Sequence, residues 1–221
     1  MEKIIIPKPK NDSLVAQLES LYKTFINAQS KENLNFDLSL LDWVCPLLIL
    51  PVSAYINNTR SNCEINYSPI KSYLERISFP EGVDSISLFQ QQVQKHKSFI
   101  PISVLRKEAG TSREKLEALF AEKICETLGN VSGAQNAVCY PIAELVTNIF
   151  EHSKKDVGFI FGQFYPTKNY LDICIVDCGR GFAAMYKEEK GLKLSDIDAI
   201  SEFLLARRGY RIQDTETIGI A

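Results

Sequence analysis

Three polar side chains of complementary chemistry recur at every fourth position of the segment AELVTNIFEHS, residues 143–153. Glu144 carries a carboxylate, Asn148 a carboxamide and His152 an imidazole. On a helix, positions i, i+4 and i+8 lie in one narrow stripe, so these side chains would face the same way. Ile142 and Ile149 belong to an opposing apolar stripe that can pack on a core. The segment is therefore predicted to be an amphipathic helix that presents three polar groups.

A second polar motif, Asp177-Cys-Gly-Arg-Gly181, follows directly after the mostly apolar run 171–176. An aspartate at the end of a strand can accept a hydrogen bond from an amino group of a ligand. Glycines allow the backbone to approach a ligand closely and to adopt positive φ values. A helix, a strand and then Asp-x-Gly-x-Gly is an arrangement typical of nucleotide sites.

Together, the two motifs meet the requirements of a magnesium–ATP site. Mg²⁺ prefers oxygen ligands and keeps several waters, so the carboxamide oxygen of Asn148 and the phosphates can suffice. Glu144, one turn away, can orient or deprotonate an attacking hydroxyl. Asp177 can accept a hydrogen bond from the adenine amino group, while Gly179 and Gly181 leave room for the nucleotide.

Each of these residues also has a simpler interpretation. Glu144 could be a solvated carboxylate on a helix, and Asp177 could cap a turn. His152 could stabilise the C-terminus of its helix or act near a nucleotide, and the sequence leaves both open. The spacing of Glu144 and Asn148 beside a glycine motif favours the ligand site.

Several elements must position these groups. The helix of the first motif begins either near Pro141 or near Ser132 with a bend at the proline. Two β-rich runs, 157–165 and 170–176, have a short loop between them that fits an antiparallel hairpin. Capping-box patterns at 111–114 and 195–198 predict the starts of two further helices, the second of which would end at Gly209.

The order of these motifs resembles the GHKL ATPase family, which includes gyrase, heat-shock chaperones, histidine kinases and mismatch-repair ATPases. Glu144-x-x-x-Asn148 resembles the N box of that family, and Asp177-x-Gly179-x-Gly181 its first glycine box. Thr217-Ile-Gly219 resembles the beginning of the second glycine box. The segment ELVTNIFEHS is most similar to the anti-sigma-factor serine kinases.

This resemblance implies that the chain binds ATP and Mg²⁺. It implies that Glu144 is a catalytic base and Asn148 the metal ligand. His152, together with the residues of the two glycine boxes, would contact the nucleotide; these are Asp177, Gly179, Gly181 and Gly219. Residues 182–216 would form an ATP lid that contains arginines. In the family, the second glycine box is followed by a helix and further strands, which this chain would lack because it ends inside that box.

The first part of the chain alternates between short apolar runs and helical patterns. We expect strands at 3–6, 35–39 and 63–67, and helices at 14–25, 47–56 and 68–77. This alternation predicts a small α/β layer.

The alternation of strands and helices in this part of the chain resembles a STAS-like domain, the fold of anti-sigma-factor antagonists. In the family, the loop before the second helix often carries a phosphorylatable serine, but the matching stretch here, Trp43-Val-Cys-Pro-Leu47, has no hydroxyl. A helix packed on a small sheet is the preferred interpretation.

These observations predict a protein of the α/β class whose second part is an α+β two-layer sandwich. Residues 1–80 would form the STAS-like domain and residues 81–110 a linker that contains a strand near 99–104. Residues 111–221 would form the ATPase-like domain, incomplete in its second glycine box.

Composition excludes several classes of protein. The formal net charge of −2 gives no reason to expect a nucleic-acid partner. No apolar run has the length needed to span a membrane, and the N-terminus does not resemble a signal peptide, so we expect a cytoplasmic protein. The six cysteines are dispersed without any Cys-x-x-Cys pair, which favours reduced thiols over disulfides or a zinc site.

Two functions therefore compete. The first is phosphoryl transfer from Mg–ATP to a protein hydroxyl, or ATP hydrolysis, in partner-switching signalling. The second is a non-catalytic GHKL module, either gated by ATP or no longer able to bind it, that regulates a protein partner. A homodimer is compatible with either function.

Overall fold

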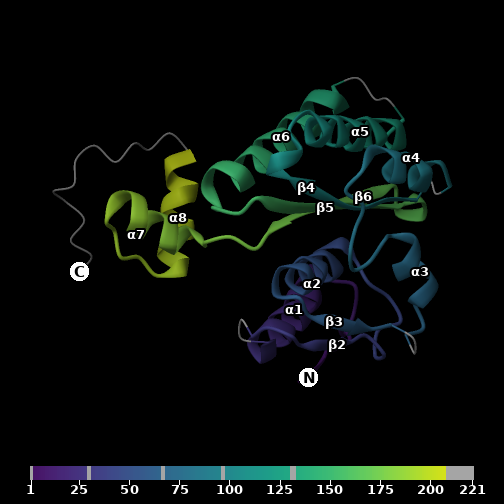
Figure 1. The fold of residues 1–221 in the computed structure, drawn as a ribbon, viewed down its shortest axis with the longest axis horizontal. Helices are drawn as coiled ribbons and strands as arrows, with labels where there is room; N and C mark the ends of the chain where they lie inside the picture. Colours follow the sequence, from purple (N-terminus) through teal and green to yellow (C-terminus); the bar gives the residue numbers. More distant parts are fainter. Residues whose placement is uncertain (1, 29–30, 66–67, 96–97, 130–132, 208–221) are drawn as a thin grey trace.

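A computed structural model describes residues 2–28, 31–65, 68–95, 98–129 and 133–207 (Figure 1). The protein is of mixed α/β class, as predicted, with two three-stranded sheets. One sheet is parallel and comes from the N-terminal part of the chain. The other is antiparallel and comes from the C-terminal part.

The N-terminal part alternates strands and helices, as the sequence predicts. Its elements are β1 (Lys3–Ile5), α1 (Leu14–Ala28), β2 (Asn35–Asp37), α2 (Pro46–Thr59), β3 (Asn62–Glu64) and α3 (Lys71–Arg76). The strands are parallel, in the order β1-β2-β3, with Ile4 opposite Phe36 and Phe36 opposite Cys63. These three side chains face the helices. On the outer face, Lys3 pairs with both Asp37 and Glu64, with each N···O distance 3.0 Å.

The rest of the chain forms the second sheet and its helices. In chain order, the elements are α4 (Ile86–Lys95), β4 (Phe99–Arg106), the 3₁₀ helix η1 (Lys107–Ala109), α5 (Thr111–Thr127), α6 (Ala134–His152), β5 (Val157–Tyr165), η2 (Pro166–Lys168), β6 (Tyr170–Asp177), α7 (Phe182–Lys190) and α8 (Asp196–Arg207). Strand β5 is central, and both of its neighbours are antiparallel to it. The predicted hairpin of β5 and β6 is confirmed.

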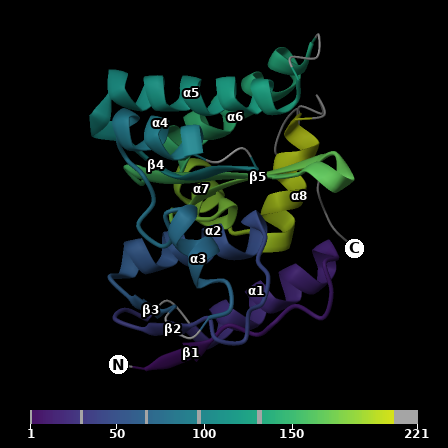
Figure 2. The ribbon, with the colours of Figure 1, turned by 90° about the vertical axis from the view of Figure 1, so that its right-hand side faces the viewer.

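The elements stack in four layers (Figures 1 and 2). The parallel sheet is at one end, followed by α1 and α2, then the antiparallel sheet, and finally α4, α5 and α6. Helix α2 packs against both β5 and β6 while it also covers the parallel sheet. One hydrophobic core therefore joins residues of the N-terminal layer, such as Phe36 and Leu48, to residues of the antiparallel sheet, such as Phe161.

The composition of α2 explains its place between two sheets. Its sequence, PLLILPVSAYINNT, is apolar on every side rather than along one stripe, which is typical of a helix buried all round. Leu48, Ile49, Leu50 and Val52 are completely buried. Pro46 occupies the first turn, where its missing N–H group costs no hydrogen bond.

The other face of the antiparallel sheet carries a second core. Ile100, Leu105 and Ile160 from the strands contact Phe120 of α5 and Ile149 of α6 in this cluster. The sheet is thus covered on both faces. This explains why β4 is almost entirely apolar, with all of its residues but the last one buried.

The segment 81–110, predicted as a linker with a strand, contains α4, β4 and η1. Helix α4 packs against β4 and α5, and β4 forms one edge of the sheet. The pairing of β4 with β5 shifts between Ile100 and Ser103, around Pro101, which has no N–H group to donate. On the other side of β4, the N–H group of Val83 donates to the carbonyl of Ile102, and the N–H group of Val104 donates to the carbonyl of Val83.

Helices α7 and α8 form a hairpin that projects away from the four layers (Figure 1). They pack on each other through Phe182 and Phe203, whose ring centroids are 4.5 Å apart. Tyr186 and Ala199 are buried between the two helices. Helix α8 was predicted from its capping pattern, whereas α7 was not predicted.

One of the two predicted capping boxes is confirmed. The Ser195 hydroxyl accepts a hydrogen bond from the N–H group of Asp198 at 3.2 Å. A similar cap stands at the start of α1, where the Ser13 hydroxyl accepts a hydrogen bond from the N–H group of Ala16 at 3.3 Å. The capping box at Thr111 is wrong. Thr111 is already helical, and Gly110, with a φ of 47°, precedes the helix because the chain enters it directly from η1.

All six cysteines are free thiols, as the sequence predicts. Burial raises the pKa of Cys45, Cys63 and Cys178 to about 11 and that of Cys174 to about 12, so these thiols stay protonated at neutral pH. No helix in the described part of the chain has both the length and the apolar character needed to cross a membrane.

Candidate functional site

Helix α6 has the two faces that the sequence predicts. Ile142, Val146 and Ile149 are buried on the sheet side. Glu144 and His152 are exposed, and Asn148 is half-buried between the two faces. The helix starts at Ala134 and continues through Pro141, which selects the earlier of the two predicted starts. The three polar groups therefore lie along the outer side of one helix.

The Asp177 motif begins where β6 ends. The Asp177 carboxylate accepts a hydrogen bond from the N–H group of Gly179 at 2.7 Å, so this aspartate caps the turn of its own loop. The side chain of Asp177 is otherwise exposed. A carboxylate has two oxygens and about four acceptor positions, so this cap leaves it able to accept a ligand hydrogen bond.

Gly179 brings this loop against the end of α6. A Cβ atom at Gly179 would lie 2.4 Å from both the Cβ atom and the carbonyl oxygen of Ser153, closer than real atoms approach. Only glycine allows this contact. Gly181 differs, because a Cβ atom there would meet no atom within 4 Å. Among the described residues, packing therefore requires a glycine at position 179, whereas no steric contact requires Gly181 to be a glycine.

Arg180, which the sequence interpretation overlooked, holds the loop and α6 together. Its N–H group donates to the carbonyl of Ser153 at 3.0 Å, and its Nε atom donates to the carbonyl of His152 at 2.9 Å. The side chain is only 9% exposed. It thus satisfies the carbonyl groups that a helix leaves unpaired at its C-terminus, and its positive charge complements the helix dipole there.

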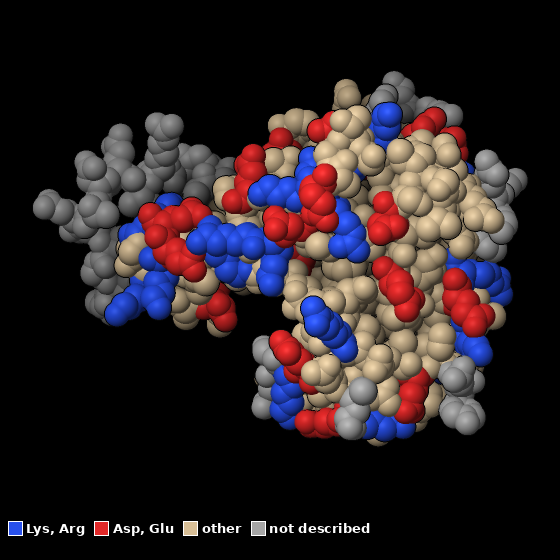
Figure 3. Space-filling model, in the orientation of Figure 1, with Lys and Arg blue, Asp and Glu red and all other residues tan. Residues whose placement is uncertain are grey.

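Arg180 also fixes α7. Its guanidinium pairs with Glu188 at 2.7 Å and with Glu189, and Lys154 pairs with Glu188 as well. Hydrogen bonds from Lys154 and Arg180 hold the pKa of Glu188 below its ordinary value. Figure 3 shows acidic and basic side chains interleaved where the α7–α8 hairpin meets the body of the protein. We call Arg180, Lys154, Glu188 and Glu189 the Arg180 network.

The structure brings some of the predicted residues together and separates others. His152 and the Asp177 motif meet through Arg180 and Gly179. Asn148 lies one turn further back on α6, about 6 Å along the axis, and Glu144 lies two turns back, about 12 Å. Gly219 is outside the described residues. In the sequence, two features could have pointed to Arg180. It lies inside the glycine motif, and it precedes Glu188 and Glu189 by eight and nine residues.

The donor set at this place suits Mg²⁺ only in combination with phosphate oxygens. Within the described ranges, no group of three or more His, Cys, Asp or Glu side chains could hold a metal ion. Asn148 offers one neutral oxygen, which fits an ion that takes most of its ligands from phosphates and waters. The chemistry of the residues therefore fits a nucleotide-bound Mg²⁺ and does not fit a metal ion held by protein alone.

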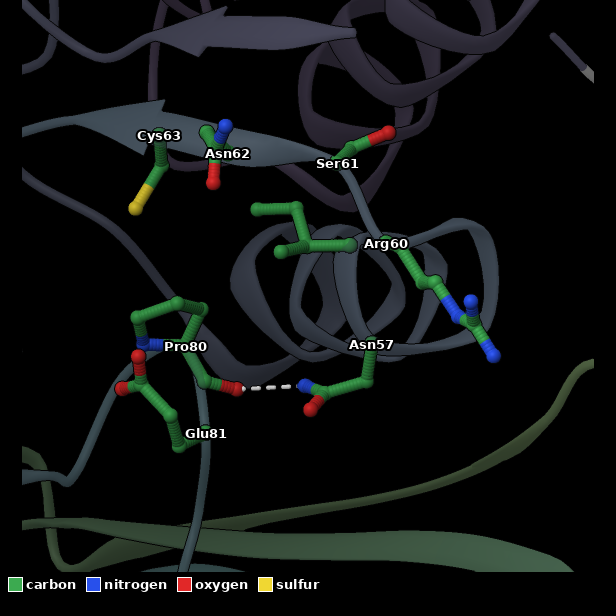
Figure 4. Close-up of a pocket in the computed structure, with 8 residues that line it drawn as sticks. Asn57, Arg60, Ser61, Asn62, Cys63, Pro80 and Glu81 are labelled. Carbon is green, nitrogen blue, oxygen red and sulfur yellow. Dashed lines mark hydrogen bonds between the residues drawn. The ribbon is translucent and has the colours of Figure 1, made fainter. Parts of the chain in front are cut away.

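A cavity of about 420 Å³ lies elsewhere, at the C-terminal end of α2 (Figure 4). Asn57, Arg60 and Glu81 are among the residues that line it, and the Nδ2 atom of Asn57 donates to the carbonyl of Pro80 at 2.8 Å. None of the predicted site residues that the structure describes lines this cavity. The candidate site is thus a surface beside α6 and the Asp177 loop rather than this hollow.

No family model matches the chain, and comparison with curated proteins and with solved structures gave no match either.

Proposed function

We propose that this protein binds Mg–ATP beside α6 and the Asp177 loop, in the manner of GHKL ATPases. In the proposed arrangement, residues 1–80 form a STAS-like domain and residues 111–221 an ATPase-like domain, whose sheet also includes β4 from the segment predicted as a linker. Asp177 would accept a hydrogen bond from the adenine amino group, and His152 and Gly181 would line the nucleotide. Asn148 would offer its oxygen to Mg²⁺.

The contact between Gly179 and Ser153 carries this proposal. It presses the loop after β6 onto the end of the helix that contains Glu144 and Asn148, with no room for a side chain between them. Two motifs that are separate in the sequence thereby become neighbours in space. A site in which two elements contact one ligand requires those elements to lie close together.

The chemistry proposed for this site is phosphoryl transfer. Glu144 would orient or deprotonate the attacking hydroxyl of a protein or of water. Asn148 would help to position the phosphates through Mg²⁺, which would offset their charge. In such reactions, positioning and electrostatic stabilisation provide most of the catalysis. The proposed setting is cytoplasmic signalling by partner switching, with the STAS-like part in contact with a protein partner.

A non-catalytic module is the second candidate, and one observation favours it. The α7–α8 hairpin, which contains most of the proposed lid, stands away from α6 and is tied to the body by the Arg180 network (Figure 1). A nucleotide that moved this hairpin could change how a partner binds without any turnover. In that case ATP would act as a gating ligand.

The test is binding of a fluorescent ATP analogue, titrated with and without Mg²⁺. We expect Asn148→Ala to weaken the Mg²⁺-dependent binding about tenfold or more, equivalent to about 1.4 kcal/mol. Asn136→Ala is the matched control, because Asn136 is an exposed asparagine on the same helix. Failure of the unmodified protein to bind the analogue would refute both ATP-dependent functions.

Turnover separates the two candidates. If the protein is an enzyme, Glu144→Gln should reduce phosphate release about 100-fold or more while binding persists. Glu151→Gln, which alters another exposed carboxylate of α6, should leave the rate unchanged. Binding without turnover in the unmodified protein would instead support the gated module.

A further inference from the structure

A second hollow, of about 270 Å³, lies between the N-terminal layer and the tip of the β5–β6 hairpin. Its walls come from three separate parts of the chain: the residues around the start of α1, those around the start of α2, and the segment from the end of β5 through η2 into β6. Lys168 on the hairpin tip and Asp12 before α1 form an ion pair at 2.8 Å across its rim. The hollow is thus built from distant segments that the fold holds together.

Three aromatic side chains, Trp43, Tyr165 and Tyr170, line this hollow. The rings of Tyr165 and Tyr170 are stacked, with centroids 5.9 Å apart and planes 22° from parallel. Trp43 is 36% exposed and Tyr170 52% exposed, so two of the rings are accessible to a ligand from solvent. Aromatic rings gathered around one hollow can attract a cation to their faces.

The hollow also has a carboxylate available to such a cation. Its charged lining residues are Asp12, Lys168 and Asp172. Asp12 and Lys168 pair with each other, whereas Asp172 has no ion pair within the described ranges and accepts a hydrogen bond from the Tyr170 hydroxyl at 2.5 Å. The net charge of the lining is therefore negative, next to the aromatic rings.

The other polar groups of these lining residues are either paired or out of reach. Gln17 donates to the Asp12 carbonyl and accepts from Cys45. The hydroxyl of Tyr165 is buried and has almost no accessible surface, so a ligand in the hollow does not contact it. The features of the hollow that suit a cation are therefore its aromatic rings and the Asp172 carboxylate.

From these observations we infer that the hollow binds a small organic ammonium ion. The ammonium group lies against Trp43 and Tyr170 and near the Asp172 carboxylate. This site is separate from the proposed ATP site and does not depend on it.

Choline is a suitable probe, because it carries a quaternary ammonium group and has an uncharged counterpart of the same shape. Its neutral counterpart 3,3-dimethylbutan-1-ol has the same shape without the charge. In calorimetric titrations of the full chain, we expect saturable binding of choline and at least tenfold weaker binding of the neutral alcohol. Equal binding of the two compounds, or no saturable binding of choline, would overturn the proposal.

Variants locate the binding within the hollow. Asp172→Asn and Trp43→Leu should each weaken choline binding about tenfold. Tyr22→Leu should not change it, because Tyr22 is an exposed aromatic residue of α1 that does not line the hollow. Binding that survives both Asp172→Asn and Trp43→Leu would contradict the assigned site, provided that circular dichroism shows both variants to be folded.

Discussion

Helix α2 and the α7–α8 hairpin are attached to the protein by opposite means. Helix α2 is buried between two sheets, and its apolar side chains contact both of them. The hairpin is joined to the body by the Arg180 network and the Gly179 contact, and it exposes apolar residues such as Ile197 and Leu204, 77% and 57% exposed.

This difference predicts two levels of stability in one chain. Apolar burial on two faces makes α2 part of the unit that unfolds last. Ion pairs with exposed carboxylates contribute little and are screened by salt, so the hairpin can separate from the body at a small cost in free energy. A segment proposed to act as a lid needs that property.

The largest expected effect is on α2. Leu50→Ala removes a completely buried side chain from the core shared by both sheets and should lower the free energy of unfolding by about 2–5 kcal/mol. Leu40→Ala, at a position 54% exposed, should change it by less than about 0.5 kcal/mol. Urea denaturation measures both. Equal effects would mean that α2 does not belong to the last unit to unfold.

Gly179→Ala should have the next largest effect. The added methyl group would overlap the Ser153 backbone, so the loop must move away from α6, at a cost of about 1–3 kcal/mol. Gly181→Ala is the control, because its methyl group meets open space at a φ of −72°. Thermal unfolding and hydrogen exchange of α7 measure the result. If Gly181→Ala were as damaging as Gly179→Ala, the close contact could not be the cause.

Arg180→Ala should release the hairpin while it leaves the layers intact. We expect amide exchange in α7 to become several-fold faster and the midpoint of global unfolding to stay nearly constant, because only the Arg180 network is lost. Lys187→Ala, which removes an exposed cation of the same helix, should change neither quantity. A large shift of the global midpoint would instead assign Arg180 to the core unit.

The smallest effect is a dependence on pH. The pKa of Glu188 is lowered in the folded protein, so its ion pairs contribute fully above the ordinary glutamate value of 4.5 and are lost as the pH falls through the lowered pKa. Exchange in α7, corrected for the intrinsic rate, should therefore accelerate relative to that in α5 as the pH falls from 6 to 3. Glu188→Gln should remove most of this acceleration.

Local patterns were enough to predict much of the fold. Alternation and loop length gave the β5–β6 hairpin, and the spacing of Ile142 and Ile149 gave the buried face of α6. Helices α4 and α7 were not predicted. In ISLFQQQVQK, the glutamines hid a helical spacing of Ile86, Phe89 and Val93, whereas in FAAMYKEEK the apolar residues stand together in the first half and show no periodicity.

Residues whose partners are distant in the sequence were harder to predict. The two motifs of the candidate site were found because each is compact in the sequence. The hydrogen bonds of Arg180 to the end of α6, however, depend on the close contact between Gly179 and Ser153, which are far apart in the sequence. The aromatic hollow joins Trp43 to Tyr170 and has no local pattern. The apolar character of α2 also does not show that its second face packs on β5 and β6, which are formed from residues after 156.

The position of α2 also has a consequence for how the chain folds as it is synthesised. The strands that cover its second face emerge about 100 residues after α2 itself, which at typical rates of synthesis is on the order of 5–20 s later. During that interval the nascent N-terminal layer has an apolar helix surface with no native partner. A transient binder such as a chaperone would find its target there, and contacts so far apart in sequence are expected to slow the final step of folding.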